Sequence, residues 1–264
     1  MNDTRPTARV RELWRYPVKS MQGAAVDTVD VTPGGIAGDR AWAVVDAASG
    51  KALSAKTVAE LLQATARAVD GEVHIDLPGR AAIVAGTPEC NDALSEWLAR
   101  DVELRRAAAD AHASYEMTFD PPNDDAERFA IPSPDGTFFD LAALHVLTAN
   151  SLAACAHTYP DGEWDRRRFR ANVLVSEHGD EPFPEDAWVG RPVRIGGTTI
   201  DVLMRTVRCA MPLRAQPACG NDGPLARDIE LYKAMDAVHE NHLGVYASVR
   251  EPGPIALGDE IVVG

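Results

Sequence analysis

Short apolar segments broken by glycine and proline run through most of this chain, and they constrain its fold more than any other feature. Residues 25–35 alternate apolar and polar side chains and end in a Pro-Gly-Gly turn, and residues 73–86 have the pattern of a hairpin around Pro78 and Gly79. Alternation with a period of two is typical of half-buried β-strands. Many short strands with few helices favour a barrel over a doubly wound parallel sheet. We therefore predict a β-rich mixed α/β fold.

Helical patterns occupy only a small part of the chain. At the start of each of three helical patterns there is a polar residue that can cap a helix. The three expected helices are residues 90–101, capped by Asn91, a helix that begins near Asn150, and residues 221–241, capped by Asn221 or Asp222. Residues 118–137 are rich in proline, aspartate and glycine, so we expect a long surface connection there.

Charge and cysteine content exclude several classes of function. Lysine and arginine number 26 and aspartate and glutamate 40, which gives a net charge of −14. Such an acidic chain is a poor partner for nucleic acid or for an anionic membrane surface. It has no apolar run near the ~20 residues of a membrane span, and its first residues do not resemble a secretory signal. With four scattered cysteines and no CxxC pair, free thiols in the cytoplasm are expected.

Four turn segments gather basic residues in this acidic chain. The first two contain Lys19-Ser20 and Asp39-Arg40. The other two are residues 166–172, with four arginines and Asn172, and residues 205–209, with Arg205, Arg208 and Cys209. If the fold brings these segments together, they form a cradle for an anion such as phosphate, because arginine and lysine make charge-assisted hydrogen bonds. The alternative is that each arginine is solvated at the surface.

Cys209 directly follows Arg208, and this position leaves two interpretations open. A neighbouring cation favours the thiolate, which binds soft metals or attacks electrophiles. A lone cysteine can equally be a small buried apolar residue. Cys90 and Cys155 lie in expected helices and are predicted to be structural, and Cys219 lies in a turn as an exposed bystander. His145 is predicted to be a core histidine within an apolar strand.

Several segments, taken in order, resemble one known family. They are "LWRYPVKSMQG", "GIAGDRAWAVVD", "KALSAKTVAELLQATAR", "CNDALSEWL", "FFDLAALHVLTANSL", "RFRANVLVSE", "PFPEDAWVG", "RCAMP" and "LGVYASVREPGPIALGDEI". The chain resembles MOSC-domain proteins, named after the C-terminal domain of molybdenum cofactor sulfurase. It is most similar to their two-part type, which includes the mitochondrial amidoxime-reducing component and bacterial relatives, and the resemblance runs nearly end to end.

The resemblance implies a MOSC β-barrel with an inserted or preceding smaller α+β subdomain. Residues 1–46 and 138–264 would form the discontinuous barrel, and residues 47–137 the subdomain with its Pro/Asp-rich connection. It also implies a molybdenum cofactor, Mo-molybdopterin, with Cys209 as the catalytic thiolate ligand of the metal. The residues that would bind the pterin or its phosphate are Lys19, Ser20, Arg40, Asp140, Arg170, Asn172 and Arg208.

The activity implied by the resemblance is that of a molybdenum-dependent oxidoreductase. Its substrates would be N-oxygenated small molecules such as N-hydroxylated amidines, and its electrons would come from a separate donor protein. The run "AMPLRAQPACG" after Cys209 departs from the family pattern, so two alternatives stay open. One is a cysteine-based sulfur carrier, or carbon–sulfur chemistry on the barrel without molybdenum. The other is a carrier of the cofactor without catalysis.

Overall fold

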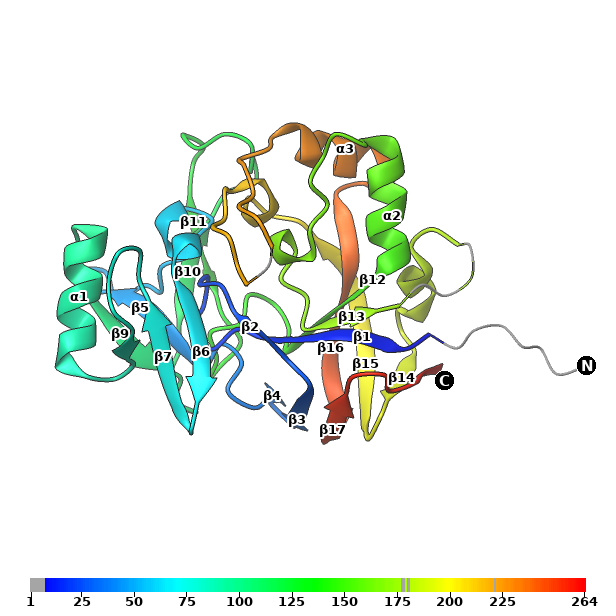
Figure 1. The fold of residues 1–264 in the computed structure, drawn as a ribbon, viewed down its shortest axis with the longest axis horizontal. Coiled ribbons are helices and arrows are strands. Elements are labelled where there is room, and N and C mark those ends of the chain that lie inside the picture. Colours follow the sequence, from blue (N-terminus) through cyan, green and yellow to red (C-terminus); the bar gives the residue numbers. More distant parts are fainter. Residues whose placement is uncertain (1–7, 177–178, 180, 221) are drawn as a thin grey trace, which may run out of the picture.

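The computed structural model describes residues 8–176, 179, 181–220 and 222–264, and most of its regular elements are β-strands (Figure 1). The strands are β1 (Val10–Arg15), β2 (Ala24–Val26), β3 (Thr28–Thr32), β4 (Gly35–Ile36), β5 (Trp42–Asp46), β6 (Thr65–Val69), β7 (Glu72–Asp76), β8 (Ile83–Val84), β9 (Val102–Arg106), β10 (Ser114–Met117), β11 (Phe129–Pro132), β12 (Leu144–Thr148), β13 (Val173–Val175), β14 (Pro192–Ile195), β15 (Thr198–Val207), β16 (His242–Glu251), β17 (Gly253–Ala256) and β18 (Ile261–Val263). The helices are α1 (Pro88–Leu98), α2 (Ala149–Thr158) and α3 (Glu230–His239), with short 3₁₀ turns η1 (Ala59–Gln63), η2 (Arg166–Arg168), η3 (Pro184–Trp188) and η4 (Met211–Leu213). The prediction of a β-rich fold with few helices is confirmed.

One curled eight-stranded sheet dominates the fold, in the order β18-β14-β15-β16-β12-β13-β1-β2. Its neighbouring strands are antiparallel except for β12 and β13, which are parallel. The start of β1 also meets β18, because the Val10 amide donates to the Asp259 carbonyl at 2.8 Å and the Ile261 amide to the Ala8 carbonyl at 2.9 Å. These bonds bring the far end of the sheet back against β1, so the sheet wraps around its own apolar core.

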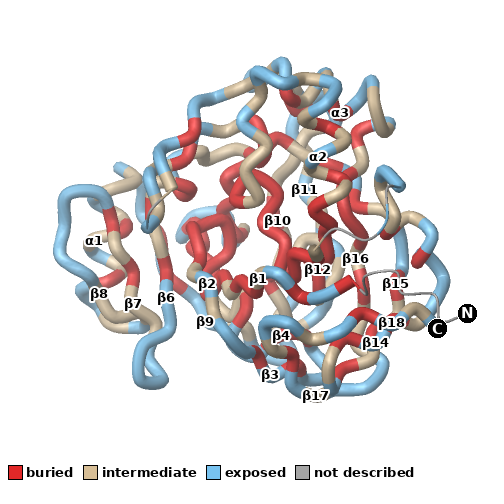
Figure 2. Tube along the Cα trace, turned by 45° about the vertical axis from the view of Figure 1, so that its right-hand side comes forward, coloured by how far each residue is buried: buried red, intermediate tan, exposed pale blue. Residues whose placement is uncertain are grey.

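The burial pattern along each strand matches its position in the fold. In β3, Val29 and Val31 are buried while the alternate residues are exposed, as expected for a strand with one wet face. All five residues of β12 are buried, because the main core lies on one face and α2 and α3 pack over the other. Figure 2 shows the same contrast, with buried segments concentrated along β1, β12 and β16. The described helices include none that is long and apolar enough to cross a bilayer.

A second layer of structure, rich in blue to green segments, stands beside the main sheet (Figure 1). Here β5 pairs with β9, β6 with β7 and β8, and β10 with β11, and α1 packs against β9. Its apolar core includes Val18 and Met21 from the N-terminal segment and Met211 from the C-terminal half. The predicted boundary at residue 46 falls at the end of β5, which pairs with β9 outside the main sheet. The division into a discontinuous barrel and a subdomain stays a prediction.

The start of helix α1 differs from the prediction, whereas that of α2 agrees with it. Helix α1 begins at Pro88, and the Thr87 hydroxyl caps it by accepting from the Cys90 amide at 3.2 Å. The prediction that Asn91 is the cap is wrong, because its side chain instead accepts from the Leu104 amide at 2.9 Å. Helix α2 begins at Ala149, which confirms the prediction of a helix that begins near Asn150.

The expected helix over residues 221–241 is shorter in the structure. Helix α3 begins at Glu230, and the Asp228 carboxylate accepts from the Leu231 amide at 3.1 Å. Asp222 is therefore not its cap, and Asn221 lies outside the described residues. The residues before α3 do not extend the helix because main-chain bonds pair Gln216 with Leu225 instead. The predicted surface connection 118–137 contains one regular strand, β11, which pairs with β10.

Candidate active site

A polar pocket lies where the turns after β1, β4, η2 and β15 meet. All eight residues predicted to hold the cofactor line it, although 190 positions separate the first from the last in the printed sequence. They are Lys19, Ser20, Arg40, Asp140, Arg170, Asn172, Arg208 and Cys209. Each of the four basic segments thus contributes at least one cation to the same pocket, namely Lys19, Arg40, Arg170 and Arg208. The binding roles of these residues stay predictions.

The Asp39-Arg40 turn is held against the turn after β1 by Tyr16. The Tyr16 amide donates to the Asp39 carboxylate at 2.7 Å, and the Arg40 amide donates to the Tyr16 carbonyl at 2.7 Å. The Tyr16 ring lies between two guanidinium groups, with Arg170 at 4.2 Å and Arg40 at 5.0 Å from its centroid. Burial raises the pKa of Tyr16 to about 12, so the ring stays neutral between the two cations. Tyr16 therefore places both arginines at the pocket wall.

Three residues of the pocket have left-handed backbone conformations. The φ angles are 68° at Ser20, 47° at Arg40 and 55° at Arg170. Side chains disfavour this region, and such strain persists only where the surrounding structure enforces it. Each of these residues carries a donor side chain to the same pocket, so the strain aims polar groups at one point.

In the described part of the chain, two buried arginines carry hydrogen-bond donors without a protein partner. Arg170 Nη1 donates to the Met21 carbonyl at 2.6 Å, and Arg208 Nη2 to the Phe169 carbonyl at 3.0 Å. Arg170 Nη2 and Arg208 Nε are also buried, but neither has a partner among the described residues. Leaving charged donors buried and unpaired is costly. Both atoms belong to residues that line the pocket.

The Asn172 side chain joins three segments of the pocket wall by hydrogen bonds. Its side-chain oxygen accepts from the His145 amide at 3.2 Å and from Arg40 Nη1 at 3.3 Å, and its nitrogen donates to the Trp14 carbonyl at 3.3 Å. These bonds join β1, β12 and the Arg40 turn. Asn172 therefore acts in this structure as a positioning residue that holds Arg40 in place.

A carboxylate bridges two buried lysines at the other side of the pocket. Asp140 accepts from Lys19 Nζ at 2.5 Å and from Lys56 Nζ at 2.7 Å. Burial disfavours the Asp140 carboxylate, but the two ammonium groups outweigh this and hold its pKa well below the usual value. Burial lowers the pKa of Lys19 to about 8, with Asp140 opposing the shift. Lys19 can therefore exchange a proton near neutral pH.

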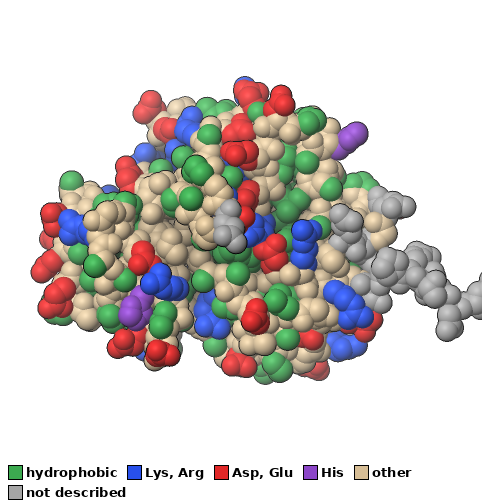
Figure 3. Space-filling model, in the orientation of Figure 1, with side chains coloured by type: hydrophobic (Ala, Val, Ile, Leu, Met, Phe, Trp, Pro, Cys, Tyr) green, Lys and Arg blue, Asp and Glu red, His purple; other side chains and the backbone are tan. Residues whose placement is uncertain are grey.

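The charges of the pocket differ from those of the whole chain. Four cations line it, namely Lys19, Arg40, Arg170 and Arg208, against the single carboxylate of Asp140. Over the face shown in Figure 3, by contrast, acidic and basic side chains are scattered singly and in small groups. The pocket is therefore a local basic site in a chain of net charge −14.

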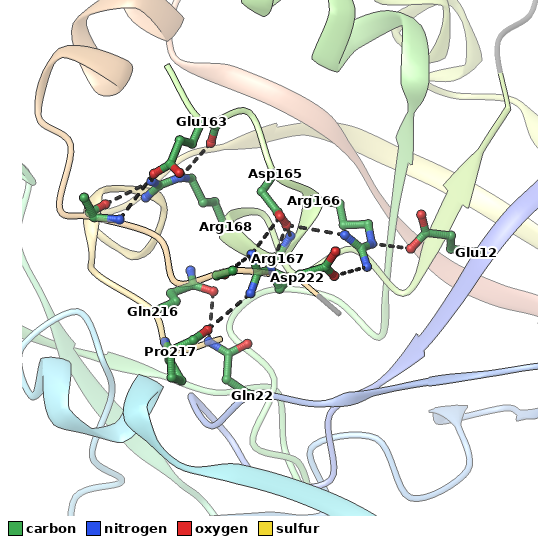
Figure 4. A network of polar contacts seen from close by, with 12 residues as sticks. Glu12, Gln22, Glu163, Asp165, Arg166, Arg167, Arg168, Gln216, Pro217 and Asp222 are labelled. Carbon is green, nitrogen blue, oxygen red and sulfur yellow. Dashed lines mark hydrogen bonds and ion pairs between the residues drawn. The ribbon is translucent and has the colours of Figure 1, made fainter. Parts of the chain in front are cut away.

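Three of the predicted basic residues, Arg166 to Arg168, do not belong to the pocket. Arg166 pairs with Glu12 and with Asp222, Arg167 pairs with Asp165 at 2.9 Å, and Arg168 pairs with Glu163 at 3.3 Å (Figure 4). Arg167 and Arg168 also donate to main-chain carbonyls of the segment that follows Cys209, namely those of Pro212, Pro217, Gly223 and Ala226, and Arg168 Nε donates to the Glu163 carbonyl. The expectation that they join the anion cradle is corrected, because these acids and carbonyls already satisfy their donors. Arg205 likewise lies outside and pairs with Glu240 at 3.1 Å.

Cys209 lies half-buried in the pocket wall, and His145 and Tyr246 line the same pocket. Burial and the nearby Arg208 lower the pKa of His145 well below its usual value, so its ring is neutral. The described residues contain no cluster of three His, Cys, Asp or Glu side chains suited to a metal ion. A metal at Cys209 would therefore need most of its ligands from a bound cofactor.

Sequence reasoning missed several residues of the site. They are Lys56, Ala142, Phe169, Val207, Met211 and Tyr246, together with His145, which was assigned to the core alone. Lys56 could have been suspected, because it is a single cation between the apolar residues of "ALSAKTVAELL". Tyr246 carries no such signal, since a tyrosine within an apolar strand has the pattern of a core residue.

Two family models match the chain and together cover most of it. The MOSC domain matches residues 134–262, and the MOSC N-terminal beta barrel domain matches residues 7–115. The chain is a two-part MOSC protein. This confirms the resemblance found in its sequence, and its sheet-rich architecture agrees with the beta-barrel description of the N-terminal model.

Two curated relatives of this MOSC protein are both named amidoxime-reducing components. It is 25% identical over 192 residues to mitochondrial amidoxime-reducing component 1 of Danio rerio, a match covering 71% of this chain and 54% of the relative. It is 24% identical over 293 residues to mitochondrial amidoxime reducing component 2 of Bos taurus, covering 96% of this chain and 82% of the relative. The chain thus spans only about half the length of the first relative.

Solved structures give more distant likenesses. The YuaD protein of Bacillus subtilis has a TM-score of 0.48 at 14% identity, over 98% of this chain and 97% of that one. YiiM of Geobacillus stearothermophilus has a TM-score of 0.33 at 12% identity, over 59% and 73% of the two chains. TM-scores below 0.5 support no functional argument.

Proposed function

We propose that this MOSC protein is a molybdenum-cofactor oxidoreductase that reduces small N-oxygenated compounds with electrons from a separate donor protein. The observation that carries the proposal is the pair of unpaired buried guanidinium donors, Arg170 Nη2 and Arg208 Nε, in the same pocket as Cys209. An anionic group and a soft-metal donor are thus expected side by side. The names of the curated relatives, amidoxime-reducing components, supply the substrate class.

The residues of the pocket fit a phosphorylated pterin that carries a metal. Arg40, Arg170 and Arg208 would hold the phosphate and pterin, because arginine forks match phosphate oxygens and two of the forks retain free donors. Ser20 has its hydroxyl in use, since it accepts from the Ala55 amide at 3.0 Å, so it shapes the wall and can donate one hydrogen bond. When bound, the cofactor supplies two-electron redox chemistry at its metal.

The protein's own contribution to the reaction is orientation, sulfur ligation and proton supply. Reduction of an N-hydroxylated group takes two electrons and two protons and releases one water. Lys19 Nζ, with a pKa of about 8, holds a proton that it can release into the pocket. Asp140 and Lys56 keep that ammonium in place, since Asp140 bridges both lysines. Cys209 would supply the thiolate.

The test compares Cys209→Ser with Cys219→Ser in protein from a host that makes the cofactor. Both thiols are half-buried, but Cys219 lies outside the pocket. Molybdenum is measured by elemental analysis, pterin by fluorescence after release, and turnover of N-hydroxybenzamidine with reduced viologen as electron donor. We expect Cys209→Ser to keep pterin and lose at least about 100-fold in kcat/KM, about 2.7 kcal/mol of transition-state stabilisation. Cys219→Ser should behave as wild type.

Three results would contradict the proposal. Wild-type turnover by Cys209→Ser in a molybdenum-loaded preparation would make Cys209 a core residue without catalytic function. Cys209-dependent chemistry in wild-type protein that holds no molybdenum would favour the alternative of a sulfur carrier or carbon–sulfur chemistry. Cofactor binding without turnover would favour a carrier of the cofactor.

A further inference from the structure

A second cavity adjoins the candidate site and opens between the β10–β11 hairpin, α3 and β16. The two share five lining residues, Asp140, Val207, Arg208, Cys209 and Tyr246. Its other walls are mainly apolar and aromatic, with Tyr115, Met117, Phe119, Ile131, Leu141 and Tyr232. Cys209 therefore stands at the junction between a basic pocket and an apolar one.

The mouth of this cavity exposes apolar side chains to water. Phe119 is 83% exposed, Val207 52% and Leu141 46%, and all three line the cavity. The Phe119 ring rests on Phe129, with 4.2 Å between the ring centroids. Large exposed apolar side chains gathered around one opening cost free energy unless something covers them, which marks a binding site.

The inner end of the cavity offers polar groups whose charges are already paired. Lys56 Nζ lies 2.7 Å from the Asp140 carboxylate and 4.1 Å from the centroid of the Tyr115 ring. The Tyr115 hydroxyl donates to the Asp140 carbonyl at 3.3 Å. An occupant would thus find aromatic walls along its length and hydrogen-bonding groups, with Cys209, at its end. This polarity suits a small molecule with a flat apolar body and one polar head.

We propose that this second cavity binds the aromatic body of the substrate and directs its N-oxygenated head toward Cys209. The proposal rests on the proposed function for the nature of the head, whereas the aromatic body follows from the cavity walls. Aromatic side chains favour ring ligands through stacking and edge contacts as well as burial. The protein therefore prefers aromatic over small aliphatic members of the substrate class.

The test uses one binding probe, two substrates and a matched pair of leucine variants beside Phe119→Ala. N-hydroxy-4-fluorobenzamidine binding is measured by fluorine NMR without electron donor, and kcat/KM is compared for N-hydroxybenzamidine and N-hydroxyacetamidine. Phe119→Ala should raise the dissociation constant of the fluorinated probe roughly tenfold, and Leu141→Ala about threefold. Leu257→Ala is the control, because Leu257 is 44% exposed and lies outside the cavity.

The outcomes separate this inference from the proposed function. Loss of probe binding in Phe119→Ala and Leu141→Ala, but not in Leu257→Ala, supports the cavity even where no variant turns over substrate. Normal turnover with the same aromatic-to-aliphatic ratio of kcat/KM in all variants overturns the cavity and leaves the proposed function standing. Equal affinity for the fluorinated probe in wild type and Phe119→Ala overturns the inference about the cavity as well.

Discussion

At the scale of single residues, the pocket depends on residues whose backbone conformation or buried charge is unfavourable in itself. Arg170 combines a positive φ angle with a guanidinium group that is buried and only partly paired. Burial and the neighbouring Arg40 lower the pKa of Arg170 to about 10. These unfavourable features persist in the protein without a bound anion. Binding of an anion should therefore stabilise the folded state.

The titration of Lys19 predicts how anion binding depends on pH. Lysine is cationic below its pKa, and burial lowers the pKa of Lys19 to about 8. The cation is therefore present near neutral pH and is lost as the pH rises through 8. We expect the dissociation constant for sulfate, measured by calorimetry at constant ionic strength, to rise about tenfold between roughly pH 6.5 and 9.5.

Lys19→Arg provides the control for this titration. A guanidinium group stays charged across the whole range, so its binding curve should be flat. A slope of the same size in Lys19→Arg and wild type would show that another group titrates and would contradict the assignment.

At the scale of elements, the arginine turn η2 supports the segment that follows Cys209. Arg168 is fully buried and donates to the carbonyls of Glu163 at 2.8 Å, Pro212 at 2.9 Å and Ala226 at 2.9 Å. Arg167 likewise donates to the Gly223 carbonyl at 2.9 Å and to the Pro217 carbonyl at 3.2 Å, the second of which is seen in Figure 4. This segment lacks regular strands or long helices, so side-chain donors replace the usual ladder of main-chain bonds.

Arg168→Ala is expected to destabilise the protein and to loosen this segment. Three main-chain carbonyls, of which that of Pro212 is buried, lose their bond to the guanidinium group at about 1 kcal/mol each, so the free energy of unfolding should fall by about 3 kcal/mol. Amide hydrogen exchange should accelerate over residues 212–226 more than elsewhere. Arg194→Ala is the control, since Arg194 is exposed on β14. A loss below about 0.5 kcal/mol in denaturant titration would contradict this role.

At the scale of the whole molecule, the two layers share one of their apolar cores. Val18 and Met21 of the N-terminal segment pack with Val44 and Leu61 of the second layer and with Met211 near Cys209. Residues from both halves of the chain therefore bury this core together. The pocket lies on the same shared region, because Lys19 and Ser20 sit between Val18 and Met21.

This shared core predicts cooperative unfolding of the described chain. Differential scanning calorimetry should show one transition, with a ratio of van't Hoff to calorimetric enthalpy near ~1. Two separate transitions would show that the layers unfold independently and would contradict the shared core. Sulfate should raise the single transition temperature in wild type and raise it less in Arg170→Ala.

The sequence by itself determined the strand-rich fold and picked out the basic turns that meet at the pocket. Period-two alternation in β3, the Gly-Gly and Pro-Gly turns and the basic residues beside turns are local features, so their consequences can be read locally. The same features singled out the turns of Lys19, Arg40 and Arg208 as candidates for an anion site.

Only the tertiary structure decided which basic residues face the pocket. Arg166–Arg168 and Arg170 lie in one short segment, yet the first three brace a neighbouring segment while Arg170 lines the pocket. Lys19 meets Asp140 across 121 positions, and Lys56 joins them from the other layer. No local pattern encodes such contacts, because they arise from the packing of strands that are distant in the chain.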